Sequence, residues 1–384
     1  MTDVSKRPWE PLQVITLEGS PYERGVCHGR LMREAIGEAL SLWERAYVQD
    51  AFGMSRAEFA LEVERRTDFY PAIKRWTPDL LDELKGIADG ADADFREVYA
   101  FNLADECYEL EGLPRPERCS SIGVWRSESL PPLVAQTLDI EPFWDGLQTV
   151  QRIVDPDGSS ATLVLAYPGL IGMNGMSGRG FGLCMNSLSE LASARSGLPV
   201  TMVIRGALAA ADLDAAVRFL TDVPHATGQN YLLASDEGVV DLECSSRGVT
   251  RYEPDQTGGV LLHTNSPLAS HDYRPGCVAR GGAQSGHQAE LVADSEARVR
   301  SMERFLDGDR SGPDLARTKR ALRSVAKHEG SAEYLEGDLG AALSREHMRI
   351  SYTFATSVME VGDGPRLHIS SRAWESDEYL TLEC

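Results

Sequence analysis

The chain lacks the concentrations of positive charge that suit a polyanionic partner. It has 38 Lys and Arg residues against 59 Asp and Glu residues, which gives a formal net charge of -21. No run of basic residues offsets this acidity, so the surface repels nucleic-acid phosphates and anionic lipids. We therefore expect no nucleic acid and no membrane among its partners.

Long apolar runs are also absent. No stretch approaches the roughly 18 uninterrupted apolar residues of a membrane-spanning helix. Residues 1–10 carry charges and prolines where a signal peptide would have an apolar core. We expect a cytoplasmic protein whose 384 residues form one large domain or two modest ones.

Cysteine is scarce and scattered. The 7 cysteines are odd in number and widely spread, which excludes the disulfide framework of a small secreted domain. None belongs to a C-x-x-C pair, so a structural zinc site is not expected. The plain interpretation of any one of them is a buried thiol that behaves as a small apolar side chain.

Cys119 differs from the others because the chain changes character there. Before it lies an acidic segment, Asp105 to Glu117, which we interpret as an exposed linker because Pro114 and Pro116 forbid a continuing helix. After it, an apolar run indicates a strand. We predict that the Arg118–Cys119 bond is cut. The freed α-amino group, with an ordinary pKa of about 7.7 to 8.0, would then act as the base for its own thiol.

The hydrophobic pattern differs on the two sides of this cysteine. Upstream, apolar spacings of three to five and capping signatures predict a helical block over residues 20–110, after a short strand at Leu12–Leu17. The expected helices run from Pro21 to about Val48 and begin again at Ser55, Thr77 and Asp94.

Downstream, short apolar runs between turns predict strands and only a few helices. The strands are Ser120–Trp125, Leu133–Leu138, Leu147–Val154, Ala161–Tyr167, Gly182–Asn186, Thr201–Ile204, Tyr231–Ala234, Val239–Glu243, Tyr352–Val361 and Arg366–Ser371. The helices are Asp212–Leu220, Ser295–Leu306 and Asp314–Lys327. This order predicts an α+β fold of stacked antiparallel sheets covered by helices.

Polar residues at strand ends complete a candidate site. A hairpin would bring the carboxylate of Asp139 close to Cys119, where it can orient the new amine. Asn186 and Asn230 lie at the ends of two other strands, one at a last residue and one just before a first, and offer amide donors to an oxyanion. Arg298 falls on the apolar face of a predicted helix, where a guanidinium needs a carboxylate partner. The plainer alternative is that these are turn residues and a solvent-reaching arginine.

Two other interpretations remain open. His263, after the apolar Val260–Leu262, would serve Cys119 in a Cys-His hydrolase that is never cut. A non-catalytic binding protein whose acidic surface meets a basic partner is the second. The other histidine candidates are His225, His271 and His287.

Together these residues resemble the isopenicillin N acyltransferase (acyl-CoA:6-aminopenicillanic acid acyltransferase) family of N-terminal-nucleophile (Ntn) cysteine hydrolases, which are related to bile-salt hydrolases and penicillin V acylases. The segment Gly19 to Gly29 is similar to the family's G-x-x-x-E-x-G-x-x-x-G helix opening. Further motifs follow in the family's order: Cys119-Ser120-Ser121, Gln136 to Asp139, Gly172-Met173-Asn174, Asn186, Gly228-Gln229-Asn230, His263-Thr264-Asn265 and Ser295-x-x-Arg298.

The resemblance implies a four-layer αββα sandwich with an N-terminal helical segment. Residues 1–118 would be released by self-cleavage yet stay bound to the catalytic chain, residues 119–384. It implies no metal or organic cofactor, because the nucleophile, the base and the oxyanion donors are all protein groups. The implied partners are a small-molecule amide or acyl donor, with an acyl-CoA or an amine acceptor among them, and the enzyme's own cleaved chain.

The resemblance also assigns roles within a self-processing amide hydrolase or acyltransferase. Cys119 becomes the nucleophile, Asp139 its orienting carboxylate, and Arg298 a supporting cation near that aspartate. Asn230 becomes an oxyanion donor, with Asn186 as its companion. Whether water or an amine takes the acyl group separates hydrolysis from transfer.

Substrate binding is assigned by the same route. Gln136 stands where the bile-salt branch has an arginine, so bile salts are not favoured as substrates. The apolar residues themselves also indicate an acyl-binding or aromatic wall, and packing in the core explains the same residues as well. The substrate-binding residues implied are Ser121, Gln136 and Asn174, and the wall would involve Phe143, Trp144, Met173 and Met176.

Overall fold

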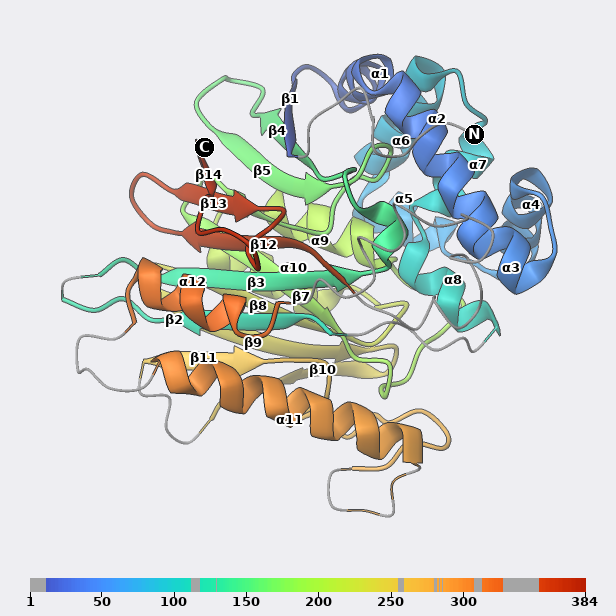
Figure 1. The fold of residues 1–384 in the computed structure, drawn as a ribbon. Helices are drawn as coiled ribbons and strands as arrows, with labels where there is room; N and C mark the ends of the chain where they lie inside the picture. Colours follow the sequence, from blue (N-terminus) through green and yellow to red (C-terminus); the bar gives the residue numbers. More distant parts are fainter. Residues whose placement is uncertain are drawn as a thin grey trace.

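The computed structural model describes residues 12–111, 118–128, 130–254, 259–279, 282, 284, 286–306, 313–326 and 352–384. A short strand, β1 (Gln13–Leu17), is followed by a helical block at the upper right of Figure 1. The block's helices are α1 (Pro21–Leu31), α2 (Arg33–Trp43), α3 (Gln49–Phe52), α4 (Arg56–Arg66), α5 (Tyr70–Trp76), α6 (Pro78–Ala91), α7 (Phe95–Phe101) and α8 (Ala104–Glu111), with a π-helical turn at Glu44–Val48.

Two sheets follow the block. The larger has the strand order β1-β4-β5-β6-β7-β8-β9-β10 and the smaller β11-β2-β3-β12-β13-β14. Within the described residues, β1 and β4 pair in parallel and the other neighbouring strands run antiparallel. The strands are β2 (Ser120–Val124), β3 (Leu133–Ile140), β4 (Thr149–Val154), β5 (Ala161–Ala166), β6 (Asn174–Ser177), β7 (Phe181–Ser187), β8 (Gln229–Ser235), β9 (Gly238–Ser245), β10 (Gly248–Arg251), β11 (Val260–His263), β12 (Tyr352–Glu360), β13 (Arg366–Ser370) and β14 (Leu380–Glu383).

The sheets pack face to face, with β2 and β3 against β7 and β8. Helices α9 (Val200–Leu208) and α10 (Leu213–Asp222) contact the larger sheet. Helices α11 (Gly286–Leu306) and α12 (Leu315–Arg323) contact the smaller one and lie at the bottom and left of Figure 1. The predicted α+β class and the four-layer αββα sandwich with its N-terminal helical segment are therefore confirmed.

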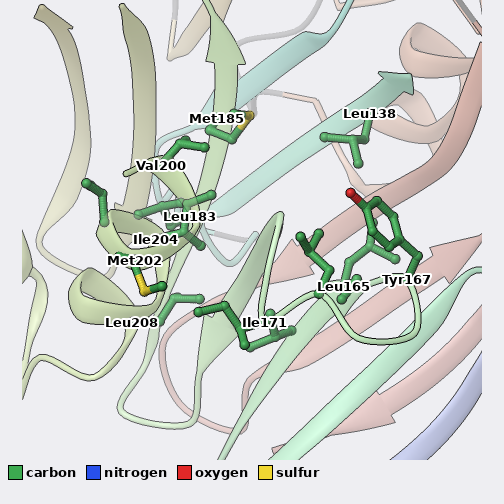
Figure 2. Close-up of a cluster of buried hydrophobic side chains, with 14 of the residues drawn as sticks. Leu138, Leu165, Tyr167, Ile171, Leu183, Met185, Val200, Met202, Ile204 and Leu208 are labelled. Atoms are coloured by element: carbon green, nitrogen blue, oxygen red, sulfur yellow. The ribbon is translucent and has the colours of Figure 1, made fainter. Parts of the chain in front are cut away.

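Helix α9 occupies a segment that we predicted as a strand. Figure 2 shows Val200, Met202, Ile204 and Leu208 clustered beside Leu183, and all five are buried. A short apolar run with β-branched residues does not distinguish a buried strand from a buried helix. The prediction of a strand at Thr201–Ile204 was therefore wrong.

The first part of the acidic segment before Cys119, up to residue 111, is helical and not the exposed linker that we predicted. Helix α8 begins at Ala104 and buries Cys107, Tyr108 and Leu110 in the main core. Its carboxylates accept hydrogen bonds from the sandwich. Glu106 Oε1, for example, accepts one of 2.9 Å from the backbone N–H of Val200 at the start of α9. The linker was predicted from its crowded acidic residues, and the donors that pair with them lie far along the chain. Residues 112–117, where the prolines lie, are outside the described residues.

The helix expected from Pro21 to Val48 is broken at Met32, which has φ -112° and ψ 18°. The break allows α1 to lie against α6 while α2 turns its own apolar face, including Ile36 and Leu40, into the core. Ser20 forms the predicted capping box with Glu23. The helix start is therefore confirmed, and its length was overestimated.

Four glycines let α1 and α6 approach at backbone distance. Gly25 and Gly29 face Gly86 and Gly90, each pair separated by one helical turn. A Cβ atom at Gly25 would lie 2.0 Å from the Glu83 carbonyl oxygen, and one at Gly86 would lie 2.2 Å from that of Tyr22. Only residues without a side chain fit this contact, which gives the G-x-x-x-G part of the N-terminal motif a packing role.

Replacing Gly86 with alanine should lower the free energy of unfolding by about 2 to 4 kcal/mol, because backbone atoms block the new methyl group and the two helices must separate. Gly37→Ala is the matched control in helix α2. Nothing lies within 4 Å of its Cβ position, so that variant should gain about 0.5 to 1 kcal/mol. Urea unfolding of both variants measures the difference, and a neutral Gly86→Ala would contradict the packing argument.

Candidate active site

Cys119 lies immediately before β2 and is only 5% exposed. The antiparallel pairing of β2 with β3 sets Ser120 opposite Thr137, and the Cys119 thiol donates to the backbone oxygen of Asp139 at 3.7 Å. Burial, and secondarily the Asp139 carboxylate, raise the pKa of the Cys119 thiol to about 12. In the uncut chain the thiol is therefore neutral at pH 7 and needs a base to become a nucleophile.

Asp139 is a buried carboxylate with one unused oxygen. Its Oδ1 accepts a hydrogen bond of 2.7 Å from Thr353, the residue opposite it on β12, whereas its Oδ2 is buried without a hydrogen-bond partner. Burial raises the pKa of Asp139 to about 7, against the opposing effects of Thr353, Arg298 and Arg118. Near neutral pH this carboxylate can therefore exchange a proton.

Arg298 reaches from α11 to the peptide bond that precedes Cys119. Its Nη1 donates to the Arg118 carbonyl oxygen at 2.9 Å and to the Ser120 hydroxyl at 3.0 Å, and it also bonds the Cys119 carbonyl oxygen. The Arg298 side chain is buried, with an exposed fraction of 6%. A fixed positive charge on this carbonyl oxygen can stabilise the negative charge that develops there when the carbonyl carbon is attacked.

The ion-pair partner of Arg298 is Asp294 and not the aspartate named by the family resemblance. Arg298 Nε donates to Asp294 Oδ2 at 2.8 Å across one turn of α11, and its Nη2 donates to Asn265 Oδ1 at 3.1 Å. Arg118 pairs with the other oxygen of Asp294 at 3.2 Å. The guanidinium of Arg298 still lowers the pKa of Asp139, so it acts on that carboxylate through space.

The five predicted amide and hydroxyl residues form one buried row between the sheets. Asn174 Nδ2 donates to Gln136 Oε1 at 2.7 Å, and Gln136 Nε2 bonds the Met185 carbonyl oxygen. Asn186 Nδ2 donates to Ser121 Oγ at 2.7 Å and to Asn230 Oδ1 at 2.9 Å. Ser121 and Gln136 come from the smaller sheet and the three asparagines from the larger, so the row joins the two.

The row continues to Asp241, which accepts a hydrogen bond from Asn230 Nδ2. Burial raises the pKa of Asp241 to about 7. Neither Asn186 nor Asn230 lines the cavity beside Cys119. In the uncut chain the amide of Asn230 is thus engaged within the row, and its role as an oxyanion donor stays a prediction.

A cavity of about 80 Å³, room for several water molecules, opens beside Cys119 and Asp139. Of the predicted wall, Phe143, Trp144 and Met173 line this cavity, and Met176 is buried elsewhere in the core. No sequence pattern indicated the other lining residues, because they come from segments far apart in the chain. These are Trp43, Tyr47, Asp105, Tyr108, Ile140, Glu141, Tyr167 and Ser187.

Two of the four histidine candidates form buried hydrogen bonds elsewhere. His263 is fully buried, with Nε2 2.8 Å from Glu243 Oε1 and Nδ1 2.7 Å from the Thr264 carbonyl oxygen. His225 lies with Nε2 2.8 Å from the Leu220 carbonyl oxygen, and burial lowers its pKa to about 4. His271 is exposed, and the side chain of His287 is outside the described residues. The described lining of the cavity includes no histidine, so this geometry gives the Cys-His alternative no support.

No cluster of three or more His, Cys, Asp or Glu side chains among the described residues is placed to hold a metal ion. Within the same residues, no helix combines the length and apolarity needed to cross a membrane.

Comparisons with known proteins place this geometry in context. The model of the acyl-coenzyme A:6-aminopenicillanic acid acyl-transferase family matches residues 126–326, just over half of the chain and starting shortly after Cys119. The chain is 24% identical over 298 residues to the 40 kDa form of acyl-coenzyme A:6-aminopenicillanic-acid-acyltransferase from Emericella nidulans, which covers 77% of each chain.

Solved structures with weaker likeness were also found. A mutant of the conjugated bile acid hydrolase from Clostridium perfringens is 13% identical, with a TM-score of 0.44 and coverage of 69% of this chain and 92% of that one. The penicillin V acylase from Agrobacterium tumefaciens is 14% identical, with a TM-score of 0.42 and coverage of 68% and 86%.

Proposed function

We propose, from the premise that this chain belongs to the acyl-coenzyme A:6-aminopenicillanic acid acyl-transferase family, that it cuts itself before Cys119 and then acts as an N-terminal cysteine amide hydrolase or acyltransferase. The observation that supports self-cleavage is the Arg298 guanidinium, 2.9 Å from the carbonyl oxygen of Arg118. That oxygen belongs to the peptide bond whose nitrogen is the backbone nitrogen of Cys119. The uncut chain is in this proposal a zymogen.

Self-cleavage needs only groups already present and one water molecule. Cys119 Sγ attacks the Arg118 carbonyl carbon while Asp139 takes the thiol proton, and Arg298 stabilises the oxyanion. The C–N bond then breaks, the backbone nitrogen takes the proton to become a free amine, and a thioester joins the two residues. Water hydrolyses the thioester, which releases the Arg118 carboxylate and the Cys119 thiol.

The same thiol then serves amide substrates. Its proton passes to the new α-amine as Sγ attacks the substrate carbonyl, and from there to the leaving amine, which leaves an acyl-thioester on Cys119. Water or an acceptor amine attacks this thioester and gives the acid or a new amide. Asp139 holds the α-ammonium, and Asn230 with Asn186 are the proposed oxyanion donors. Ser121, Gln136 and Asn174 support this strand end and the bound substrate.

Residues 1–118 are proposed to stay bound after the cut. Glu83 of the helical block forms a buried, forked ion pair with Arg205 of α9, at 2.8 Å and 3.0 Å. Asn102 donates to the Gly169 carbonyl oxygen at 2.9 Å. Separating the block would leave these polar groups unpaired and a large apolar surface exposed.

Intact mass and N-terminal sequencing of the purified protein test the proposal. We expect fragments 1–118 and 119–384 that copurify, with a free amino group on Cys119. A single chain of 42.0 kDa that hydrolyses amides at full rate would contradict the self-processing mechanism. Product analysis with and without an added amine acceptor then separates hydrolysis from acyl transfer.

Self-cleavage should accelerate as pH rises through about 7. The pKa of Asp139 is raised to about 7 and only the ionised carboxylate accepts the thiol proton, so its ionised fraction grows from about a tenth at pH 6 to about nine tenths at pH 8. The rate, followed by gel after rapid expression or refolding, should rise about tenfold over that range and then level off. A rate that keeps rising tenfold per pH unit would indicate direct ionisation of the thiol, without Asp139 as base.

A further inference from the structure

The cavity beside Cys119 has an aromatic wall on two sides. Trp43, Tyr47 and Tyr108 come from the helical block, with the rings of the two tyrosines 4.9 Å apart. From the sandwich, Trp144 stacks on Tyr167 at 4.0 Å with an interplanar angle of 4°. Aromatic faces favour apolar groups and also attract cations through their negative π-surfaces.

The charges in this cavity have one sign. Its described lining includes the carboxylates of Asp105, Asp139 and Glu141 and no lysine, arginine or histidine. The nearby guanidinium of Arg298 is engaged with Asp294 and backbone oxygens and does not line the cavity. An anionic group would therefore meet repulsion here without a cation to offset it.

Hydrogen bonds from neighbouring residues hold two of these carboxylates in place. Asp105 Oδ2 accepts hydrogen bonds from Gln229 at 2.7 Å and Ser187 at 3.3 Å. Glu141 accepts one of 3.2 Å from the Trp144 indole. Asp139 Oδ2, in a residue that is 97% buried, has no hydrogen-bond partner. A buried carboxylate oxygen with no partner favours a ligand that brings a donor or a positive charge.

We propose that this cavity recognises amides whose group bound beside the thiol is an apolar or aromatic body carrying a positively charged nitrogen. The inference rests on the proposed function, since it takes the cavity as the substrate pocket of Cys119. It differs from the acyl-coenzyme A and the 6-aminopenicillanic acid that the name of the fungal relative contains. After self-cleavage Asp139 serves the new α-ammonium, and Asp105 and Glu141 remain for the substrate.

The burial of these groups gives the preference its strength. Burial raises the pKa of Glu141 to about 7, so holding its negative charge is unfavourable in the empty cavity. A bound cation removes that penalty and also contacts the aromatic faces. Binding of a permanent cation should therefore strengthen as pH rises from 6 to 8, as Glu141 ionises.

Calorimetric titration of the purified protein, with residues 1–118 and 119–384 together, against three matched probes tests the inference. The probes are 2-phenylethylamine, 2-phenylethanol and phenylacetate, which share a phenyl group and carry a positive, a neutral and a negative end. We expect the amine to bind at least about tenfold tighter than the alcohol, and phenylacetate to bind most weakly. Equal or tighter binding of phenylacetate would overturn the proposal without any variant.

Asp105→Asn locates the effect. It keeps an oxygen for Gln229 but removes the charge, and should weaken the amine about tenfold while it changes the alcohol less than twofold. Asp82→Asn, at an exposed acid of α6 paired with Lys85, removes the same charge outside the cavity and should change neither. Unaltered amine binding in a folded Asp105→Asn protein contradicts the assignment. A parent protein that neither cuts itself nor hydrolyses amides, but still binds the amine more tightly than the alcohol and phenylacetate, would instead overturn the proposed function alone.

Discussion

Cys119→Ala should leave the chain at its full 384 residues and remove its amide hydrolysis, by at least about a thousandfold. Alanine keeps the small apolar volume at a buried position, so the fold should persist. What disappears is the sulfur that attacks both the Arg118 carbonyl carbon and the substrate. Intact mass measures the loss of self-cleavage, and product formation in the same preparation measures the loss of amide hydrolysis.

The matched control is Cys277→Ala, at a half-buried thiol that does not line the cavity. It should be cut and active like the parent chain. Fragments 1–118 and 119–384 appearing in the Cys119→Ala protein would show that another group, or a contaminating protease, makes the cut. Full amide hydrolysis in the Cys119→Ala protein would show that Cys119 is not the nucleophile.

Arg298→Ala should slow self-cleavage by about 100- to 1,000-fold, the usual loss when one oxyanion donor is removed. Arg298→Lys retains the charge but not the fork that reaches Asp294, Asn265 and the Arg118 carbonyl oxygen together. We expect it to cut slowly as well. The half-time of conversion to two fragments, measured by gel, is the readout.

Arg300→Ala provides the comparison on the same helix, because the Arg300 side chain is 61% exposed and pairs with Glu296, one turn earlier on α11. It should cut at the parental rate. Circular dichroism of each variant separates misfolding from slow chemistry. A folded Arg298→Lys that cuts at the parental rate would mean that Arg298 acts only through the pKa of Asp139.

The sequence predicted those parts of the site that depend on local pattern. The strand after Cys119 and the strand ending near Asp139 were recognised from their apolar runs, and a hairpin joins them. The ordered motifs correctly indicated the family. The ion pair of Arg298 with Asp294 could also have been predicted, because a carboxylate four residues earlier on a helix is the natural partner. The family resemblance instead named Asp139.

Distant contacts could not be read in this way. Thr353, which fixes Asp139, lies 214 residues further along the chain, and no pattern specifies the register of β12 against β3. The aromatic wall depends on Tyr47 and Tyr108, whose spacing in the sequence indicates only helical packing. The acids of α8 were predicted to be exposed because their donors lie far along the chain. Gln229, which donates to Asp105, is on β8 of the larger sheet.

Strand β1 has a consequence for how such an enzyme is made. It belongs to residues 1–118 but pairs with β4 at the edge of the larger sheet, so the proposed cut leaves one sheet assembled from two polypeptides. Before the cut, the ends are tethered and folding is a first-order process. Afterwards, an unfolded molecule must find its other half by diffusion, and its recovery depends on concentration. Folding followed by cutting would then be a one-way sequence, in which lasting activity reflects slow unfolding more than the equilibrium between folded and unfolded states.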